Sequence, residues 1–240
     1  MGTNKTYYRR NLPHYQPEGY TFFITFRLTG SLPINVIERL KAEYKNHIKD
    51  LESLKSNKEK QSKYLEAKWN YFEKFDSFLD KYSNNNFLKN EVVARLVYDS
   101  ILFRDRQQYN LICFCIMPNH VHTVFTPVDR DLSRSQLPTE NVDRDLSRST
   151  NNIANNSDIN VALQFPIVTN ILRLLKGSTA RECNKILNRT GAFWQHESYD
   201  HVIRSEDELN RIIEYILNNP VRAKLVDNAD EWKWSYCKYL

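Results

Sequence analysis

The hydrophobic positions of the chain follow two different periods, and the period changes several times along the sequence. Between Pro33 and Lys81 apolar residues recur every three or four positions, with one interruption at Ser56, which predicts two long helices. We therefore expect residues 34–82 to form an antiparallel helical hairpin inserted into the fold. The apolar positions that define it are Val36, Leu40, Tyr44, Ile48, Leu51 and Leu54 in the first helix and Leu65, Trp69, Phe72, Phe75 and Leu79 in the second.

Four other segments have the pattern of β-strands. Residues 21–27 and 199–203 are rich in aromatic and β-branched side chains. Residues 109–116 are almost wholly apolar, which is typical of a strand covered on both faces. A short turn at 117–119 leads into residues 120–125, so we expect this last strand to return antiparallel to the one before it.

The helical period appears in three further places. Asn90 can cap a helix whose buried face starts at Val93, and a second helix begins after Pro166, with Gly177 as a point where it breaks or bends. Ser205 and Glu208 have the spacing of a capping box, so a helix starts there and runs to about residue 218, because Pro220 follows.

Residues 128–160 differ from the rest of the chain. The octapeptide Val-Asp-Arg-Asp-Leu-Ser-Arg-Ser occurs at 128–135 and again at 142–149, and Asn-rich sequence follows. An offset of 14 residues is too short for a repeat that builds its own core, and the segment has little to bury. We interpret it as a disordered insertion within a single domain that spans residues 1–240.

Composition excludes several classes of protein. The 240 residues include only five glycines, which argues against collagen-like sequence and glycine-rich nucleotide-binding loops, so no nucleotide cofactor is expected. No apolar run approaches the ~18–20 residues of a membrane span, and the N-terminus lacks a signal-peptide core. The four cysteines show no C-x-x-C spacing. We therefore expect reduced thiols in a cytoplasmic protein that does not contact a membrane.

The net charge of +5 is unevenly distributed. Residues 1–27 carry four basic residues against one acidic, residues 166–190 carry five against one, and residues 191–240 carry six against nine. Basic stretches near aromatic residues fit a polyanionic partner, although an ordinary solvated surface explains the same charges.

Two groups of residues are candidates for chemistry. His120 and His122 lie two positions apart on a predicted strand, so their imidazoles face the same side and could bind a divalent metal. A hydrogen-bonded pair of histidines is the alternative. On the last predicted helix, Tyr215 falls off the apolar stripe and Asn219 lies one turn further along the same flank. Spacing alone does not bring Tyr215 and the histidines together.

Longer motifs surround these residues. Residues 117–122 read Met-Pro-Asn-His-Val-His, residues 193–195 read Phe-Trp-Gln, residues 199–204 read Tyr-Asp-His-Val-Ile-Arg, and residues 215–223 read Tyr-Ile-Leu-Asn-Asn-Pro-Val-Arg-Ala. Together they resemble the HUH single-tyrosine transposases, in particular the branch of REP-associated tyrosine transposases. The segment Arg-Arg-Asn-Leu-Pro-His at 9–14 and Trp-Lys-Trp-Ser at 232–235 also fit. The resemblance does not extend over residues 128–160, and it is weak over residues 34–82.

The resemblance implies a ferredoxin-like α+β fold, an antiparallel sheet with packed helices, to which the helical hairpin is added. It implies that His120 and His122 bind Mg²⁺ or Mn²⁺, that Asn219 is a third ligand, and that Tyr215 is the nucleophile. The implied activity is cleavage and transfer of single-stranded DNA at hairpin ends, through a 5′-phosphotyrosine intermediate. The oligomeric state stays open.

The DNA-binding residues expected from this resemblance fall into three groups. Trp194 and Tyr199 are candidates for stacking on unpaired bases, and the alternative is that both rings simply fill the core. Gln195 is a candidate for hydrogen bonding to the edge of a base. Basic side chains on the helix after Pro166 would contact phosphates. The full set is Arg9, Arg10, Arg173, Lys176, Arg181, Lys185, Trp194, Gln195, Tyr199, His201, Arg204 and Arg222.

Two other functions compete with this one. The first is a catalytically silent protein that binds hairpin or single-stranded DNA with the same fold. The second is a metallohydrolase that uses the histidine pair on a small substrate. The sequence offers no evident carboxylate ligand beside the pair, which argues against the second.

Overall fold

The computed structural model describes residues 7–9, 13–15, 19–52, 56–82, 85–128 and 167–239. Arg10 and almost all of the expected 128–160 insertion, including both copies of the repeat beyond Val128, lie outside these residues. β1 (Tyr7–Arg9) and β2 (Pro13–Tyr15) form a separate antiparallel pair, which places the backbone of Arg9 in a strand.

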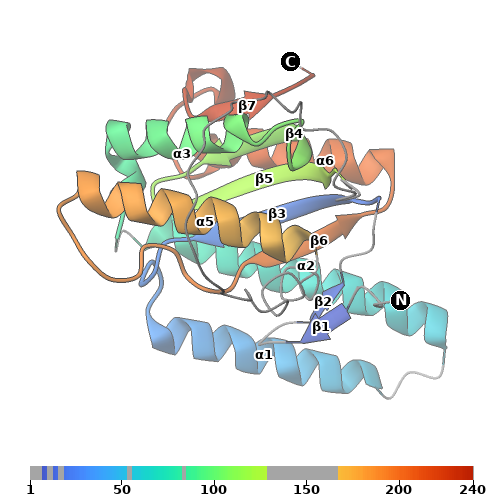
Figure 1. Cartoon of the computed structure of the whole chain (residues 1–240). Helices are drawn as coiled ribbons and strands as arrows, with labels where there is room; N and C mark the ends of the chain where they lie inside the picture. Colours follow the sequence, from blue (N-terminus) through green and yellow to red (C-terminus); the bar gives the residue numbers. More distant parts are fainter. Residues whose placement is uncertain are drawn as a thin grey trace, which may run out of the picture.

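A five-stranded antiparallel sheet forms the centre of the fold, in the order β6-β3-β5-β4-β7 (Figure 1). Its strands are β3 (Thr21–Arg27), β4 (Tyr109–Ile116), β5 (His120–Pro127), β6 (Tyr199–Ile203) and β7 (Ser235–Cys237). β3, β4, β5 and β6 follow each other with helices before β4 and before β6, which is the βαββαβ arrangement of a ferredoxin-like fold. The predicted fold class is therefore confirmed.

The two faces of the sheet are covered by different helices. α3 (Glu91–Phe103) and α5 (Ile167–Ile186) pack on one face, where Phe22, Phe26 and Phe114 belong to the same core cluster as both helices (Figure 1). α6 (Glu206–Leu217) and α2 (Asn57–Lys81) pack on the other face, against Phe23 and Val124. Because side chains alternate along β5, His120 and His122 share this second face with Val124.

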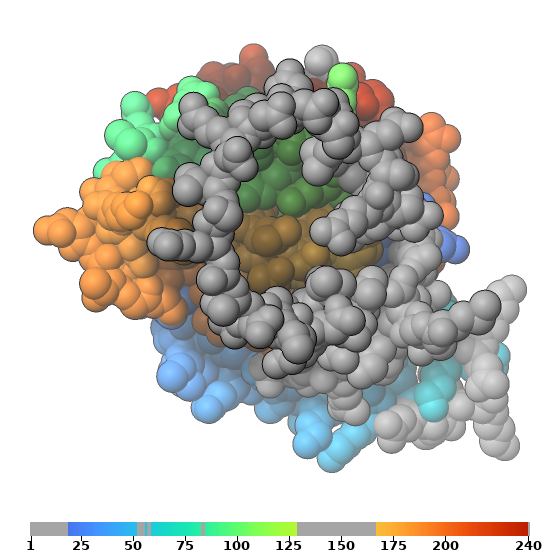
Figure 2. Space-filling view, in the orientation of Figure 1, coloured from blue at the N-terminus to red at the C-terminus, as the bar shows by residue number. Residues whose placement is uncertain are grey.

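The predicted helical hairpin is present. α1 (Ile34–Glu52) packs on α2 through Val36, Leu40 and Tyr71, and Ser56 caps α2 by accepting a hydrogen bond from the Glu59 amide. In the space-filling view α1 lies in the lower part of the molecule, below α5, and in Figure 1 α2 runs behind the sheet (Figures 1 and 2). The hairpin therefore brings α2 directly onto the face of the sheet that carries the two histidines.

Of three local expectations, one is confirmed and two need adjustment. α5 continues without a break through Gly177, because a single glycine in a helix costs only about 1 kcal/mol when packing holds it. Ser205 does cap α6 by accepting from the Glu208 amide. Glu208 does not close the capping box on Ser205, because its side chain accepts from the Arg204 amide and contacts His201 instead.

Three short elements complete the described fold. η1 (Phe87–Lys89) precedes α3, α7 (Asn219–Arg222) follows α6, and η3 (Ala229–Glu231) precedes β7. Among the described residues, no helix has both the length and the apolar character that crossing a bilayer requires.

Candidate active site

The two histidines of β5 are held by hydrogen bonds on their Nδ1 atoms. His120 Nδ1 lies 2.6 Å from Asn119 Oδ1, and His122 Nδ1 lies 2.7 Å from Thr25 Oγ1 on the neighbouring strand β3. Asn119 is itself fixed, since its amide donates to the carbonyl oxygens of Leu79 and Tyr82 at the end of α2. Both Nε2 atoms consequently face one space, 2.9 Å apart. Orientation of metal-binding histidines through the second ring nitrogen is common in metal sites.

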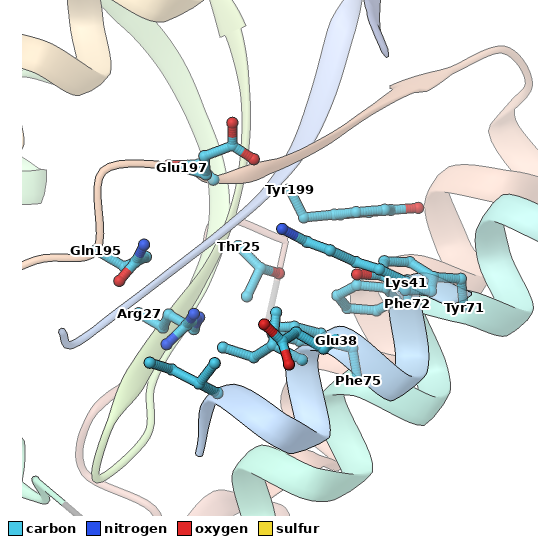
Figure 3. A pocket seen from close by; sticks show the side chains of 13 residues that line it. Thr25, Arg27, Glu38, Lys41, Tyr71, Phe72, Phe75, Gln195, Glu197 and Tyr199 are labelled. Carbon is cyan, nitrogen blue, oxygen red and sulfur yellow. The ribbon is translucent and has the colours of Figure 1, made fainter. Parts of the chain in front are cut away.

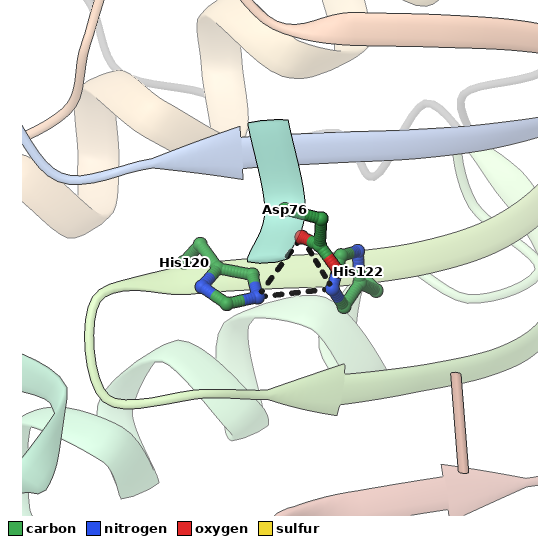
Figure 4. A group of neighbouring side chains, drawn as sticks. All are labelled: Asp76, His120 and His122. Atoms are coloured by element: carbon green, nitrogen blue, oxygen red, sulfur yellow. Dashed lines mark hydrogen bonds and ion pairs between the residues drawn. The ribbon is translucent and has the colours of Figure 1, made fainter. Parts of the chain in front are cut away.

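Asp76 of α2 completes this group (Figure 4). Its Oδ1 atom lies 3.5 Å from His120 Nε2 and 3.3 Å from His122 Nε2, and none of the three side chains is more than 1% exposed. The expectation that no carboxylate lies beside the histidine pair is therefore wrong. Asp76 is distant in sequence, and α2 carries it to the sheet. The sequence does contain a signal, because Asp76 lies between Phe72 and Leu79 on the apolar face of the predicted helix.

The donor set of this group fits a divalent cation. One ligand atom from each of the three residues lies within 4.8 Å of the others. Among the residues that the structure describes, no group forms a hydrogen bond with two buried oxygens, Asp76 Oδ1 and Asn219 Oδ1. Buried polar atoms normally have a hydrogen-bond partner, so these oxygens are available for a ligand. Imidazole nitrogens and carboxylate or amide oxygens together suit Mn²⁺ and related ions.

The protonation states also fit a cation. Burial and the neighbouring His122 lower the pKa of His120 to about 3, so its imidazole is neutral near pH 7. Burial alone would raise the pKa of Asp76, but the two imidazoles and the Tyr215 hydroxyl outweigh burial and hold that pKa below its usual range. Deprotonated ligands are the form that binds a metal.

Asn219 joins the histidines from the end of α6. The chain leaves α6 at Leu217 and starts the short helix α7, with Pro220 in its first turn, where a missing N–H breaks no helical hydrogen bond. The fully buried Asn219 amide lies 3.1 Å from His122 Nε2 and donates to Asp76 Oδ2 over 3.0 Å. The structure therefore brings Asn219 to the histidine pair.

Tyr215 lies in the same group of side chains. Its hydroxyl donates a hydrogen bond to Asp76 Oδ2, and its ring centroid is 6.0 Å from that of His122. The Arg222 guanidinium sits 4.5 Å from the centroid of the Tyr215 ring. Burial, followed by the charge of Asp76, raises the pKa of Tyr215 above its ordinary value, so the phenol is protonated in this arrangement.

A groove of about 570 Å³ runs along α2 and α6 beside Tyr215. Three of the predicted DNA-binding residues line it: Arg204 and Arg222, which are exposed, and His201, which is buried. Its charged lining consists of Arg204, Arg211 and Arg222 with Glu66, Glu73, Glu208 and Glu214. Because acidic side chains outnumber basic ones, this groove is not a simple phosphate-binding surface.

The basic residues of α5 lie on the other side of the sheet from this site. Arg173, Arg181 and Lys185 are exposed, while the half-buried Lys176 donates to His196 O and Ser198 Oγ. α5 belongs to the core cluster on the face opposite the histidines. The structure thus separates the predicted phosphate-binding helix from the predicted nucleophile.

The predicted base-stacking residues are mostly buried. Trp194 is 6% exposed and its indole N–H donates to Thr179 Oγ1 within the core. Tyr199 is 9% exposed and stacks on Phe72, with ring centroids 4.3 Å apart. His201 is buried against Glu208. These positions favour the core-filling alternative for Trp194, whereas Tyr199 and the half-buried Gln195 line a cavity between the helical hairpin and the sheet (Figure 3).

Taken together, these features define a ferredoxin-like protein with a buried His-His-Asp centre next to a tyrosine and an asparagine. Comparison with known proteins agrees with the motifs. Over 129 residues the chain is 26% identical to a Haemophilus influenzae protein named "Putative REP-associated tyrosine transposase", covering 53% of this chain and 58% of that protein. The predicted similarity to REP-associated tyrosine transposases is thereby confirmed.

Other comparisons add detail. The chain is 29% identical over 117 residues to an uncharacterized protein of Haemophilus influenzae, covering 45% of this chain and 52% of the relative. The chain thus spans little more than half the length of the curated relatives it matches. A structure of a REP-associated tyrosine transposase bound to a REP hairpin superposes with a TM-score of 0.46 and 14% identity, covering 95% of this chain and 80% of the other. No family model matches.

Proposed function

We propose that the protein is a metal-dependent single-strand DNA transesterase that cleaves at DNA hairpin ends and transfers the strand through a 5′-phosphotyrosine intermediate. The observation that carries the proposal is the convergence of Tyr215, His120, His122 and Asn219, which come from separate parts of the chain, on the carboxylate of Asp76. The similarity to a relative named as a tyrosine transposase supports the same reaction class.

The residues of this chain would have distinct roles. His120, His122 and Asp76 would hold Mg²⁺ or Mn²⁺, and Asn219 would contribute its unpartnered Oδ1. The bound cation would neutralise charge on a phosphate oxygen in the transition state. Thr25 and Asn119 would keep the two imidazoles in one orientation through their Nδ1 atoms.

Tyr215 would be the nucleophile. Its phenol oxygen forms a bond to phosphorus while the bond from phosphorus to the 3′ oxygen breaks. Asp76 Oδ2 accepts a hydrogen bond from this hydroxyl and orients it. The phenolic proton is released to solvent, and the departing 3′ oxygen takes up a proton from solvent. The phosphodiester is exchanged for a phosphotyrosyl ester, so a different 3′ hydroxyl can reverse the step without ATP.

The test is formation of a covalent adduct. A labelled DNA hairpin with single-stranded tails is incubated with the protein and Mn²⁺, and the products are separated under denaturing conditions. We expect a labelled protein band that disappears in Tyr215→Phe and after chelation of the metal. An undiminished band in Tyr215→Phe would exclude Tyr215 as the nucleophile.

A specific observation favours the alternative of a silent DNA-binding protein. The side chains of His120, His122 and Asp76 are at most 1% exposed, and Asn219 is fully buried. A DNA phosphate therefore reaches none of them in this arrangement. Binding of the hairpin without any adduct, in Mg²⁺ and in Mn²⁺, would support this alternative. Zn²⁺-dependent hydrolysis of a small ester without DNA binding would instead support a metallohydrolase.

A further inference from the structure

Two cysteines lie opposite each other at one edge of the sheet. β7 is the last strand in the sheet order and pairs antiparallel with β4 (Figure 1). In this pairing Cys113 of β4 and Cys237 of β7 are register partners. Their neighbours Phe114 and Tyr236 stack on one face of the sheet, with ring centroids 5.6 Å apart. Because side chains alternate along a strand, both thiols lie on the other face, which also carries the two histidines.

The backbone hydrogen bonds identify these two cysteines as a closely spaced pair. The Lys238 amide donates to the Ile112 carbonyl oxygen over 2.9 Å, which places this bond between the residues that flank the pair. In an antiparallel ladder such a bond marks a non-hydrogen-bonded pair, whose Cα atoms lie about 4.5 Å apart. Disulfides join cysteines whose Cα atoms are about 4.4–6.8 Å apart. The register therefore holds the two thiols at a separation that a disulfide bridges.

The two thiols differ in their access to solvent. Cys237 is half-buried, whereas Cys113, Cys115 and Cys183 are buried. Burial, followed by the neighbouring Cys237, raises the pKa of Cys113 well above its ordinary value, so Cys113 is a protonated thiol near pH 7. The thiolate and not the thiol is the form that attacks a disulfide. Cys237 is therefore the residue that an oxidant in solution meets first, and Cys113 is the residue placed to complete the bond.

The other two cysteines have different neighbours. Cys115 pairs in register with Ser235 of β7, and its sulfur lies 3.7 Å from Met117 Sδ. Cys183 belongs to the core cluster on the opposite face of the sheet. Of the four cysteines, all of which lie in the described part of the chain, only one pair therefore faces each other across two strands.

We propose that Cys113 and Cys237 form a redox site, which a small disulfide such as oxidised glutathione converts into a reversible cross-strand disulfide. The Cys237 thiolate attacks one sulfur of the oxidant, which releases one thiolate and leaves a mixed disulfide on Cys237. Cys113 gives its proton to solvent, attacks the Cys237 sulfur and displaces the second thiolate. Each cysteine loses one electron, and the oxidant is reduced to two thiols. The new bond closes a loop of roughly half the chain and fixes the edge strand to β4.

The experiment maps the cross-link in the full-length protein. Reduced protein is incubated with oxidised glutathione near pH 7, unfolded in an alkylating agent and digested without reduction. Chymotrypsin cleaves after Phe114, which separates Cys113 from Cys115, and mass spectrometry identifies the peptides. We expect a peptide with Cys113 joined to a peptide with Cys237, while Cys115 and Cys183 carry the alkyl group. The cross-linked species should disappear after treatment with dithiothreitol.

Thermal melting provides a second measurement. Oxidised protein should melt several degrees above reduced protein, because the cross-link restricts the unfolded chain. This shift should vanish in Cys237→Ala, which removes the half-buried thiol of the edge strand. It should persist in Cys115→Ala, which removes a thiol from the same face of β4 outside the pair. The peptide map of the wild type needs no variant, so a folding defect in either one does not decide the result.

The possible results decide the inference independently of the proposed function. A cross-link between Cys113 and Cys237 supports it, whether or not the protein forms a covalent adduct with DNA. Alkylation of all four cysteines, a glutathione adduct that stays on Cys237, or a cross-link from Cys237 to Cys115 or to a second Cys237 would each overturn it. A shift in Tm of equal size in Cys237→Ala and the wild type would also overturn it.

Discussion

The hydroxyl of Tyr215 donates a hydrogen bond to the carboxylate of Asp76, across 139 positions of sequence. Asp76 Oδ2 also accepts from Asn219, and Asp76 Oδ1 faces both histidines. One carboxylate on the helical hairpin therefore contacts the predicted nucleophile and every predicted metal ligand.

Removal of the Asp76 charge should weaken stabilisation by metal. In the wild type, Mn²⁺ at about 100 times its dissociation constant should stabilise the fold by about 2.7 kcal/mol, which raises Tm by several degrees in a chain of this size. In Asp76→Asn the affinity should fall by about tenfold or more, measured by calorimetry and thermal melting. Glu73→Gln, an exposed carboxylate on the same helix, is the control. Equal effects in both variants would contradict a role for Asp76 as a ligand.

The Asn219 amide should matter for stability as well as for metal binding. Asn219→Ala removes two contacts of a fully buried amide, to Asp76 and to His122, and should lower the free energy of unfolding by about 1–3 kcal/mol. Asn218→Ala changes an exposed neighbour, and its free energy of unfolding should stay within about 0.5 kcal/mol of the wild-type value. Urea unfolding of both variants makes the comparison, and similar values would show that the Asn219 contacts contribute nothing.

Asp80 should make the apo protein less stable as the pH rises. Burial, followed by the charge of Asp76, raises the pKa of Asp80 to about 7, whereas the unfolded chain has its ordinary value near 3.8. Between these values the folded state binds more protons, so its stability falls from about pH 4 up to pH 7. In chelator, Asp80→Asn should gain about 1–3 kcal/mol over the wild type at pH 8 and little at pH 4. If the difference in stability between Asp80→Asn and the wild type were the same from pH 4 to pH 8, the raised pKa of Asp80 would be ruled out.

Trp194 should contribute to the core and not to DNA binding. Its indole N–H donates to Thr179 Oγ1 over 2.8 Å, and its ring packs on Phe26 with centroids 4.9 Å apart. Trp194→Phe should lower the free energy of unfolding by about 1 kcal/mol or more, through loss of this hydrogen bond. Its affinity for a tailed DNA hairpin should equal that of the wild type. A large loss of affinity with unchanged stability would restore the base-stacking interpretation.

If DNA contacts α5, the basic residues of this helix should contribute to DNA affinity only through salt-dependent contacts with phosphates. Arg173→Ala combined with Arg181→Ala should reduce the slope of log affinity against log salt by up to about two, since each phosphate contact contributes about 0.9. The same change at Lys45 and Lys49, two exposed residues of α1, is the control. An unchanged slope in the α5 variant would show that the phosphates bind elsewhere. This result would be informative because α5 lies on the face of the sheet opposite the histidines.

The sequence by itself determined the local features of this protein. The change of period at Pro33 and Lys81 located the hairpin, and the two-residue spacing of His120 and His122 put both imidazoles on one face of a strand. The position of Tyr215 off its apolar stripe also followed from helical geometry. These features depend on residues a few positions apart, whose relative directions are fixed by the backbone of one element.

Only the tertiary structure decided which of these elements meet. Asp76 reaches the histidines because α2 packs on the face of the sheet that carries them, and α5 is excluded from the site because it packs on the opposite face. The burial of Trp194 likewise depends on contacts with Phe26 and Thr179 from other elements. Periodicity shows that a helix has an apolar face, but the surface against which that face packs depends on the complementarity of side chains far apart in sequence.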